Sequence, residues 1–149
     1  MSKNNLVDEE TVDLLMDMAM DKNYFINKGN IVYSLKECLE STSDKVLQGI
    51  YIGYKIISLD KKDINLTKRN DIINLLLNEL PNLFKDFLVY LNKEDIKTIE
   101  EYKKNGFVKN NNMTLTSNGF MYGYKEKSIV KYIVPNEFII YIIISLQMM

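Results

Sequence analysis

The sequence predicts a mainly α fold of the α+β class, a helical bundle with a C-terminal β-hairpin. Two stretches lead to this prediction. Residues 66–107 contain three successive helical patterns, and residues 120–134 contain two short alternating segments joined by a polar link. The chain has 149 residues, a length that suits a single domain over 1–149, with subdomains over 1–60 and 61–149 as an alternative.

Each helix expected within residues 66–107 has a start or stop signal. Thr67 is a suitable N-cap, and the apolar residues after it recur at helical spacing as far as Leu80. Pro81 predicts a break and a second helix, because proline is tolerated in the first turn of a helix and not in its interior. Asn92 predicts the N-cap of a third helix, and Gly106 its left-handed end.

The segments before this stretch are less regular. Residues 23–30 have the composition of a turn, and residues 31–39 fit either a short helix or a strand. Residues 46–59 fit both strand alternation and helical spacing, and their length favours a helix.

An N-terminal helix is expected over about residues 8–20. One of its sides is apolar, and the other carries acidic residues four positions apart. Like charges at this spacing repel by roughly 0.2–0.5 kcal/mol per pair, and a solvated face is the simplest interpretation. The functional alternative is a strip that binds a basic protein partner or the chain's own basic C-terminal part, formed by Glu9, Asp13, Asp17 and Asp21.

The C-terminal third changes to a β pattern. Residues 120–125 and 129–134 alternate as two short strands, with Glu126, Lys127 and Ser128 between them. Helices followed by a hairpin have the layout of a winged helix, in which the hairpin and a helix together address nucleic acid. A winged-helix-like C-terminal part is therefore expected.

The tail over residues 135–149 is strongly apolar. Pro135 and Asn136 can open a helix with Glu137 in its first turn. The apolar run is about half of the roughly 20 residues that span a bilayer, so no membrane helix is expected. Such a helix must be covered nearly all round, either by the N-terminal helices or by a second copy of the chain in a homodimer.

Composition narrows the class of protein. Cys38 is the single cysteine and the N-terminus lacks the apolar core of a signal peptide, which together predict a reducing, cytoplasmic location. The net charge is −1, but residues 102–135 carry six lysines against one glutamate, which indicates an anionic partner. Abundant Asn, Ile, Lys and Tyr beside one arginine indicate AT-rich coding, hence a bacterial or phage origin.

The residue types argue against catalysis. Histidine, the usual group for proton transfer near neutral pH, is absent, and no glycine-rich phosphate loop or dinucleotide fingerprint occurs. The adjacent acids Glu94 and Asp95, like Glu100 and Glu101, point in different directions on a helix. The sequence therefore predicts a protein that is not an enzyme and uses neither cofactor nor metal.

One run resembles the helix, extended link and helix of Rho-terminator N-terminal and SAP-type modules: DINLTKRNDIINLLLNEL. Lys68 and Arg69 stand at the basic positions of those modules, and the resemblance implies nucleic-acid contact there. The later runs are similar in order and spacing to a group of small uncharacterised Firmicutes proteins: FLVYLNKEDIKTIEEYKKNG, GFMYGY and KYIVPNEF. The cysteine-rich zinc motif of some of those proteins is absent from this chain.

Two binding functions fit these observations. In the first, lysines neutralise the phosphates of DNA or RNA while tyrosines stack on bases or lie beneath them. Its residues are Lys125, Lys127, Lys131, Tyr122, Tyr124, Lys68 and Arg69. In the second, the chain is a protein-binding adaptor or an inhibitor from a phage or mobile element, acting through the acidic strip. The layout of helices and hairpin favours the first.

Overall fold

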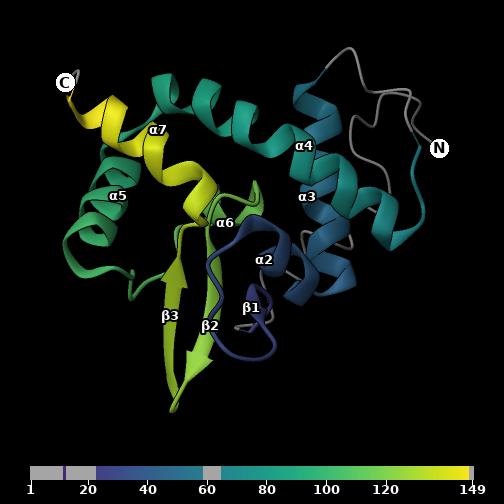
Figure 1. Cartoon of the computed structure of the whole chain (residues 1–149), viewed down its shortest axis with the longest axis horizontal. Helices are drawn as coiled ribbons and strands as arrows, with labels where there is room; N and C mark the ends of the chain where they lie inside the picture. Colours follow the sequence, from purple (N-terminus) through teal and green to yellow (C-terminus); the bar gives the residue numbers. More distant parts are fainter. Residues whose placement is uncertain (1–11, 13–22, 59–64, 148–149) are drawn as a thin grey trace.

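The computed structural model describes residues 12, 23–58 and 65–147 of the chain (Figure 1). Its helices are α2 (Leu35–Ser41), α3 (Asp44–Ile57), α4 (Arg69–Phe87), α5 (Lys93–Asn105), α6 (Met113–Ser117) and α7 (Asn136–Gln147), with a 3₁₀ turn, η2 (Leu88–Tyr90), after α4. Its strands are β1 (Ile26–Asn27), β2 (Tyr122–Glu126) and β3 (Ile129–Ile133). The mainly helical α+β class with a C-terminal hairpin is confirmed.

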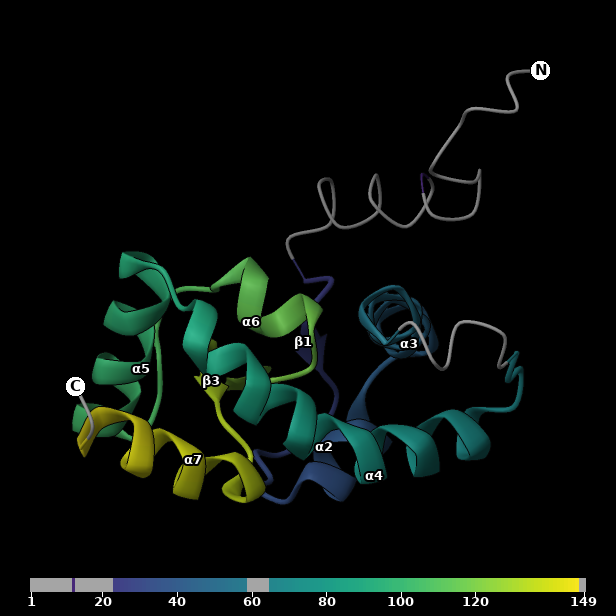
Figure 2. The ribbon, with the colours of Figure 1, turned by 90° about the horizontal axis from the view of Figure 1, so that it is seen from above.

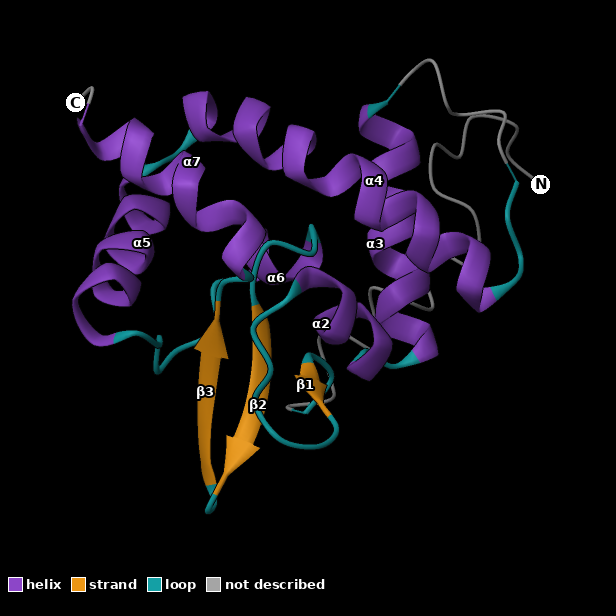
Figure 3. Cartoon of the chain, in the orientation of Figure 1, coloured by secondary structure: helices purple, strands orange, loops and turns teal. Residues whose placement is uncertain are grey.

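The sheet has one more strand than the sequence predicts. β2 and β3 form the expected antiparallel hairpin, and β1 adds to the other edge of β2 in parallel, in the order β1-β2-β3 (Figure 3). The expected turn over residues 23–30 therefore contains a two-residue strand. Residues 46–57 lie in α3, which confirms the helix that their length favoured over a strand. Of residues 31–39, the last five lie in α2 and the first four precede it without regular structure.

The break predicted at Pro81 is wrong, because α4 continues through this residue as a single helix. Leu76, Leu80 and Phe84 are spaced by four and are all buried, so an unbroken helix keeps one apolar side on the core. The ring of Phe84 stacks on Phe138 of α7 at 4.8 Å between centroids. The cap predicted at Thr67 is also wrong: Lys68 is the N-cap residue, and its side chain makes no capping hydrogen bond.

The ends of α5 follow the prediction. The Asn92 side chain accepts a hydrogen bond from the Asp95 amide, and the Asp95 carboxylate accepts one from the Asn92 amide, which makes a capping box. Gly106 ends the helix with φ of 76°. Asp95 is buried and also accepts a hydrogen bond from the side chain of Asn112, the N-cap residue of α6, so one carboxylate joins the starts of two helices.

The core lies between the helices and the sheet. Phe84, Phe87, Phe120 and Phe138 form a cluster of ring contacts that joins α4, α7 and the segment before β2. The buried hydrophobic residues run from Tyr24 to Ile142, so both halves of the chain contribute to one cluster. α4 and α7 lie beside each other at one end of the sheet, and the hairpin projects from there away from them (Figure 1). Figure 2 shows the same pair of helices from above.

Candidate nucleic-acid interface

The hairpin closes through a two-residue turn. Lys127 and Ser128 have φ of 50° and 70°, the left-handed conformation that both central residues of a type I′ turn adopt. This turn matches the twist of the strands and makes a narrow ribbon. Residues 125–129 are all exposed, so the outer half of the ribbon forms a free tip, seen at the bottom of Figure 3.

The lysines of the ribbon are divided between its two faces. Lys125 lies opposite Val130. The next pair of opposite residues, one position further from the turn, is Tyr124 and Lys131. Since successive side chains of a strand point to opposite faces, Lys125 and Lys131 are on different faces. Lys127 lies in the turn between them.

Lys131 differs from the other two lysines in having partners. Its ammonium group donates a hydrogen bond to Glu126 at 3.0 Å and lies 4.9 Å from the centroid of the Phe107 ring. Lys125 and Lys127 are exposed, and neither forms an ion pair within the described part of the chain. Of the three lysines of the ribbon, Lys125 and Lys127 are therefore the most open to an external anion.

A second basic segment lies beside the ribbon. Val108 and Tyr132 exchange backbone hydrogen bonds of 2.8 and 2.9 Å, which places the loop after α5 along the outer edge of β3. The exposed residue Lys109 follows this bridge, and its amide donates to the Glu101 carboxylate. The charge asymmetry of the sequence already indicated these residues, but no sequence signal predicted the bridge. The exposed lysines of this end of the molecule are Lys103, Lys104, Lys109, Lys125 and Lys127.

Tyr122 and Tyr124 are core residues, which excludes stacking on bases and leaves the other expected arrangement, in which the tyrosines lie beneath the binding surface. Their side chains are only 3% and 0% exposed, so no ring face is open to a base. The Tyr124 hydroxyl accepts a hydrogen bond from Asn27 at 3.2 Å. Burial raises the pKa of Tyr122 well above its ordinary value, and the Tyr122 hydroxyl has no hydrogen-bond partner among the described residues.

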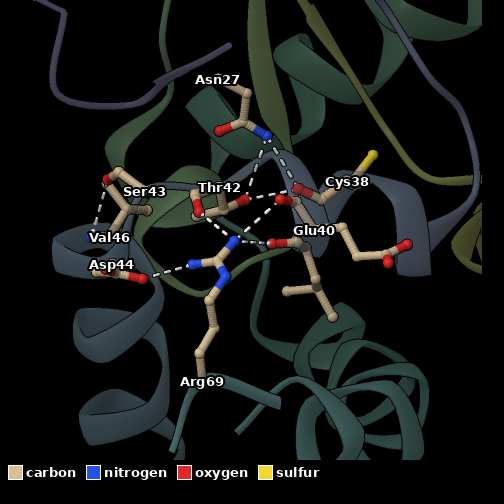
Figure 4. Close-up of polar contacts among 9 residues, drawn as sticks. Asn27, Cys38, Glu40, Thr42, Ser43, Asp44, Val46 and Arg69 are labelled. Carbon is tan, nitrogen blue, oxygen red and sulfur yellow. Dashed lines mark hydrogen bonds and ion pairs between the residues drawn. The ribbon is translucent and has the colours of Figure 1, made fainter. Parts of the chain in front are cut away.

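Arg69 holds the junction of α2 and α3, a structural role that the sequence did not predict, and its expected contact with nucleic acid stays a prediction (Figure 4). Its guanidinium group donates to the carbonyl oxygens of Leu39, Glu40 and Thr42 at 3.3, 2.9 and 2.7 Å, and to the Asp44 carboxylate at 2.7 Å. With these bonds it supplies a donor to the carbonyl groups of Glu40 and Thr42, which lie where helix carbonyls lack a partner within the helix. The Leu39 carbonyl also accepts a hydrogen bond from the Thr42 amide. Lys68, its neighbour, is exposed.

Asn27 stabilises the same junction from the side of the sheet. Its amide nitrogen donates to the Cys38 carbonyl at 3.0 Å and to the Thr42 hydroxyl at 3.2 Å, in addition to Tyr124. The Thr42 hydroxyl in turn donates to the Cys38 carbonyl at 2.7 Å. The short strand β1 is therefore connected to the helices by side-chain hydrogen bonds as well as by its pairing with β2.

Cys38 and the acidic side chains of the described residues are the groups that bear on nucleophilic and metal chemistry. Cys38 is fully buried, and this burial raises the pKa of its thiol from 9.0 to about 12, so the unreactive neutral form dominates at physiological pH. Within residues 12, 23–58 and 65–147, no three acidic, cysteine or histidine side chains gather as metal ligands would. The acidic strip at Glu9, Asp13, Asp17 and Asp21 lies outside the described residues.

The apolar tail helix is covered on one side only. Phe138 and Ile142 of α7 are buried against the core, whereas the opposite side exposes Ile140, Ile143 and Ile144 to 59%, 44% and 48%. The complete cover expected for this helix is therefore not supplied by the described part of the chain. None of the described helices combines the length and apolar character that crossing a membrane requires.

Searches against protein-family models, curated proteins and solved structures found no match to this chain.

Proposed function

We propose that this protein is a small, non-enzymatic, regulatory protein of the cytoplasm that binds nucleic acid through its β-hairpin. The observation that carries the proposal is the exposed tip, where Lys125 and Lys127 project from the body without an acidic partner among the described residues. Lysines of this kind neutralise backbone phosphates and release counterions. The lysines of the neighbouring segment, Lys103, Lys104 and Lys109, extend the positive surface.

The helix before the hairpin limits the kind of binding that is proposed. In helix-turn-helix proteins a recognition helix reads base edges in the major groove. Here the preceding helix, α6, has five residues, of which only Met113 and Thr114 are exposed, so it offers little surface for reading base edges. The proposal is therefore binding to the phosphate backbone without sequence selection, with a Kd of roughly 10⁻⁴ to 10⁻⁶ M at physiological salt.

A relation to Rho N-terminal and SAP-type modules is also part of the proposal. Of the two basic residues that stand at the basic positions of those modules, Lys68 is the exposed one.

The proposal is tested by titrating labelled DNA and RNA with the protein at several salt concentrations. The wild type should bind with an affinity that falls steeply with salt, and the double variant Lys125→Ala, Lys127→Ala should bind more weakly with a slope lower by about 1.8. The matched control is Lys85→Ala, Lys93→Ala, which removes the same charge from exposed positions of α4 and α5, outside the hairpin. Absence of binding at low salt, or equal losses in the two double variants, would contradict the proposal.

A protein partner is the second candidate function, and the exposed side of α7 favours it. Ile140, Ile143 and Ile144 recur at helical spacing, and α7 contains only one charged residue, Glu137, which accepts a hydrogen bond from the Leu35 amide. Such an uncharged stripe complements an identical stripe, so we propose a homodimer through α7.

Binding of a basic protein partner through the acidic strip, as an adaptor or an inhibitor, also remains a proposal from the sequence.

Mass measurement by light scattering over a range of protein concentrations tests the homodimer. The wild type should approach the mass of two chains, and Ile140→Glu with Ile144→Glu should give one chain. The control is Ile56→Glu, which changes an exposed isoleucine of α3. A wild type that stays monomeric at all concentrations would refute this arrangement.

A further inference from the structure

The tip of the hairpin provides charge without a stacking surface. Its exposed residues, Lys125 to Ile129, include no aromatic side chain. The tyrosines of β2 and β3 lie nearer the helices and are all buried. Proteins that bind single strands combine a positive groove with exposed aromatic rings on which successive bases stack. The second of these two parts is missing from the tip.

The positive charges are placed on both sides of the ribbon. Lys125 is on one face, Lys131 is on the other, and Lys127 lies at the end between them. A groove of a nucleic-acid duplex has a phosphate backbone along each of its two walls. In a ribbon that enters such a groove tip first, Lys125 therefore faces one wall without an ion-pair partner among the described residues, and Lys131 faces the other wall and exchanges its hydrogen bond to Glu126 for a phosphate. A single strand has one backbone and can satisfy one face at a time.

We propose that the hairpin binds double-stranded DNA in preference to single strands, by inserting its tip into the major groove. This inference rests on the proposed function and specifies its ligand. The major groove of B-form DNA is about 12 Å wide and admits a two-stranded ribbon, whereas that of A-form RNA is deep and too narrow for side chains to read. The lysine contacts go to phosphates, which position the protein and carry no sequence information.

The test compares three labelled probes of one sequence by fluorescence anisotropy at low ionic strength: the DNA duplex, one of its strands, and the RNA duplex. The DNA duplex should bind about tenfold or more tightly than either of the others. Lys125→Ala and Lys131→Ala should each weaken duplex binding, because they act on different walls of the groove.

The outcomes separate this inference from the proposed function. Equal or tighter binding of the single strand overturns the preference for duplex DNA and leaves nucleic-acid binding in place. Equal binding of the RNA duplex overturns the assignment to the major groove. A loss in only one of the two lysine variants overturns the two-walled arrangement. Binding of none of the probes overturns both proposals.

Discussion

Arg69 is the single arginine of the chain, and its guanidinium group joins three helices. It extends from the first residue of α4 to the carbonyl groups at the end of α2 and to Asp44 at the start of α3. Arginine suits this position because its planar group donates in several directions at once, which a lysine ammonium cannot reproduce with the same geometry.

Replacing Arg69 by alanine should therefore destabilise the fold. We expect a loss of about 1–3 kcal/mol in the free energy of unfolding, because charged hydrogen bonds to partly buried carbonyl groups are removed. Arg69→Lys should recover only part of this loss. Urea denaturation measures both. As a control, Asp44→Ala should cost under about 1 kcal/mol, since that carboxylate is largely exposed. A stable Arg69→Ala variant would show that the junction does not depend on this residue.

Glu126 is the acid that reduces the positive charge of the tip. It lies on the same face of the ribbon as Lys131 and accepts a hydrogen bond from its ammonium group. The variant Glu126→Gln removes this negative charge and leaves Lys131 free to meet a phosphate. Affinity for duplex DNA should rise about fivefold at low salt, and the salt slope should steepen by about 0.9. Unchanged or weaker binding, measured by anisotropy, would show that the tip does not meet phosphates.

The strand pattern alone could not place Tyr122 and Tyr124. Alternation shows that their side chains share a face of the ribbon, but it does not show whether another element covers that face. The cover comes from distant residues, among them Asn27 of β1, which donates to the Tyr124 hydroxyl. Arg69 presents the same difficulty, because its carbonyl partners lie about 30 residues earlier in the chain.

At the scale of the elements, α4 shows how packing overrides a local signal. Pro81 has no amide hydrogen to donate to the carbonyl of Leu77, and its ring crowds the preceding turn. The helix nevertheless continues, because Leu80 and Phe84 on either side of the proline are both buried in the core. A break would move Phe84 away from its ring contacts with Phe120 and Phe138.

Pro81→Ala should consequently stabilise the protein. The alanine restores a backbone hydrogen bond and relieves the crowding, and we expect a gain of roughly 1 kcal/mol or more in thermal or urea unfolding. Asn82→Ala, at an exposed neighbouring position, should give a smaller gain of about 0.5 kcal/mol from helix propensity alone. A loss of stability in Pro81→Ala would mean that packing of the proline ring outweighs the missing hydrogen bond.

Several elements with local signals were predictable, apart from the start and the proline of α4, and those with distant partners were not. The capping box and the terminal glycine of α5, and the two strands of the hairpin, follow from residues within each segment. β1 consists of two residues whose strand character comes entirely from pairing with β2, nearly a hundred positions later. The lysines of the candidate site were visible in the sequence, but their division between two faces required the register of the hairpin.

For the whole molecule, a buried thiol and buried tyrosine hydroxyls should make the folded state less stable at alkaline pH. Burial raises the pKa of the Cys38 thiol from 9.0 to about 12 and raises the pKa values of Tyr102, Tyr122, Tyr124 and Tyr132. Above about pH 9 the unfolded chain releases the protons of these groups, whereas the folded chain keeps them. The contribution of these five groups to the free energy of unfolding is therefore complete below about pH 9 and falls as pH rises towards 12.

The free energy of unfolding should thus be nearly level between about pH 7.5 and 8.5 and lower by about 2–3 kcal/mol at pH 10, as measured by urea denaturation. Cys38→Ala should reduce this decrease, because it removes the group with the lowest ordinary pKa among the five. A stability that stays constant up to pH 10 would contradict the burial of these groups.

The most direct test of the account compares Ser128→Asn with Ser128→Asp. Position 128 lies in the turn at the tip, and asparagine and aspartate both tolerate its left-handed conformation, so the two variants differ in charge alone. If the tip meets phosphates, Ser128→Asn should bind duplex DNA like the wild type, and Ser128→Asp about fivefold or more weakly at low salt. Equal affinities of the two variants would contradict the central claim that the hairpin is the nucleic-acid-binding surface.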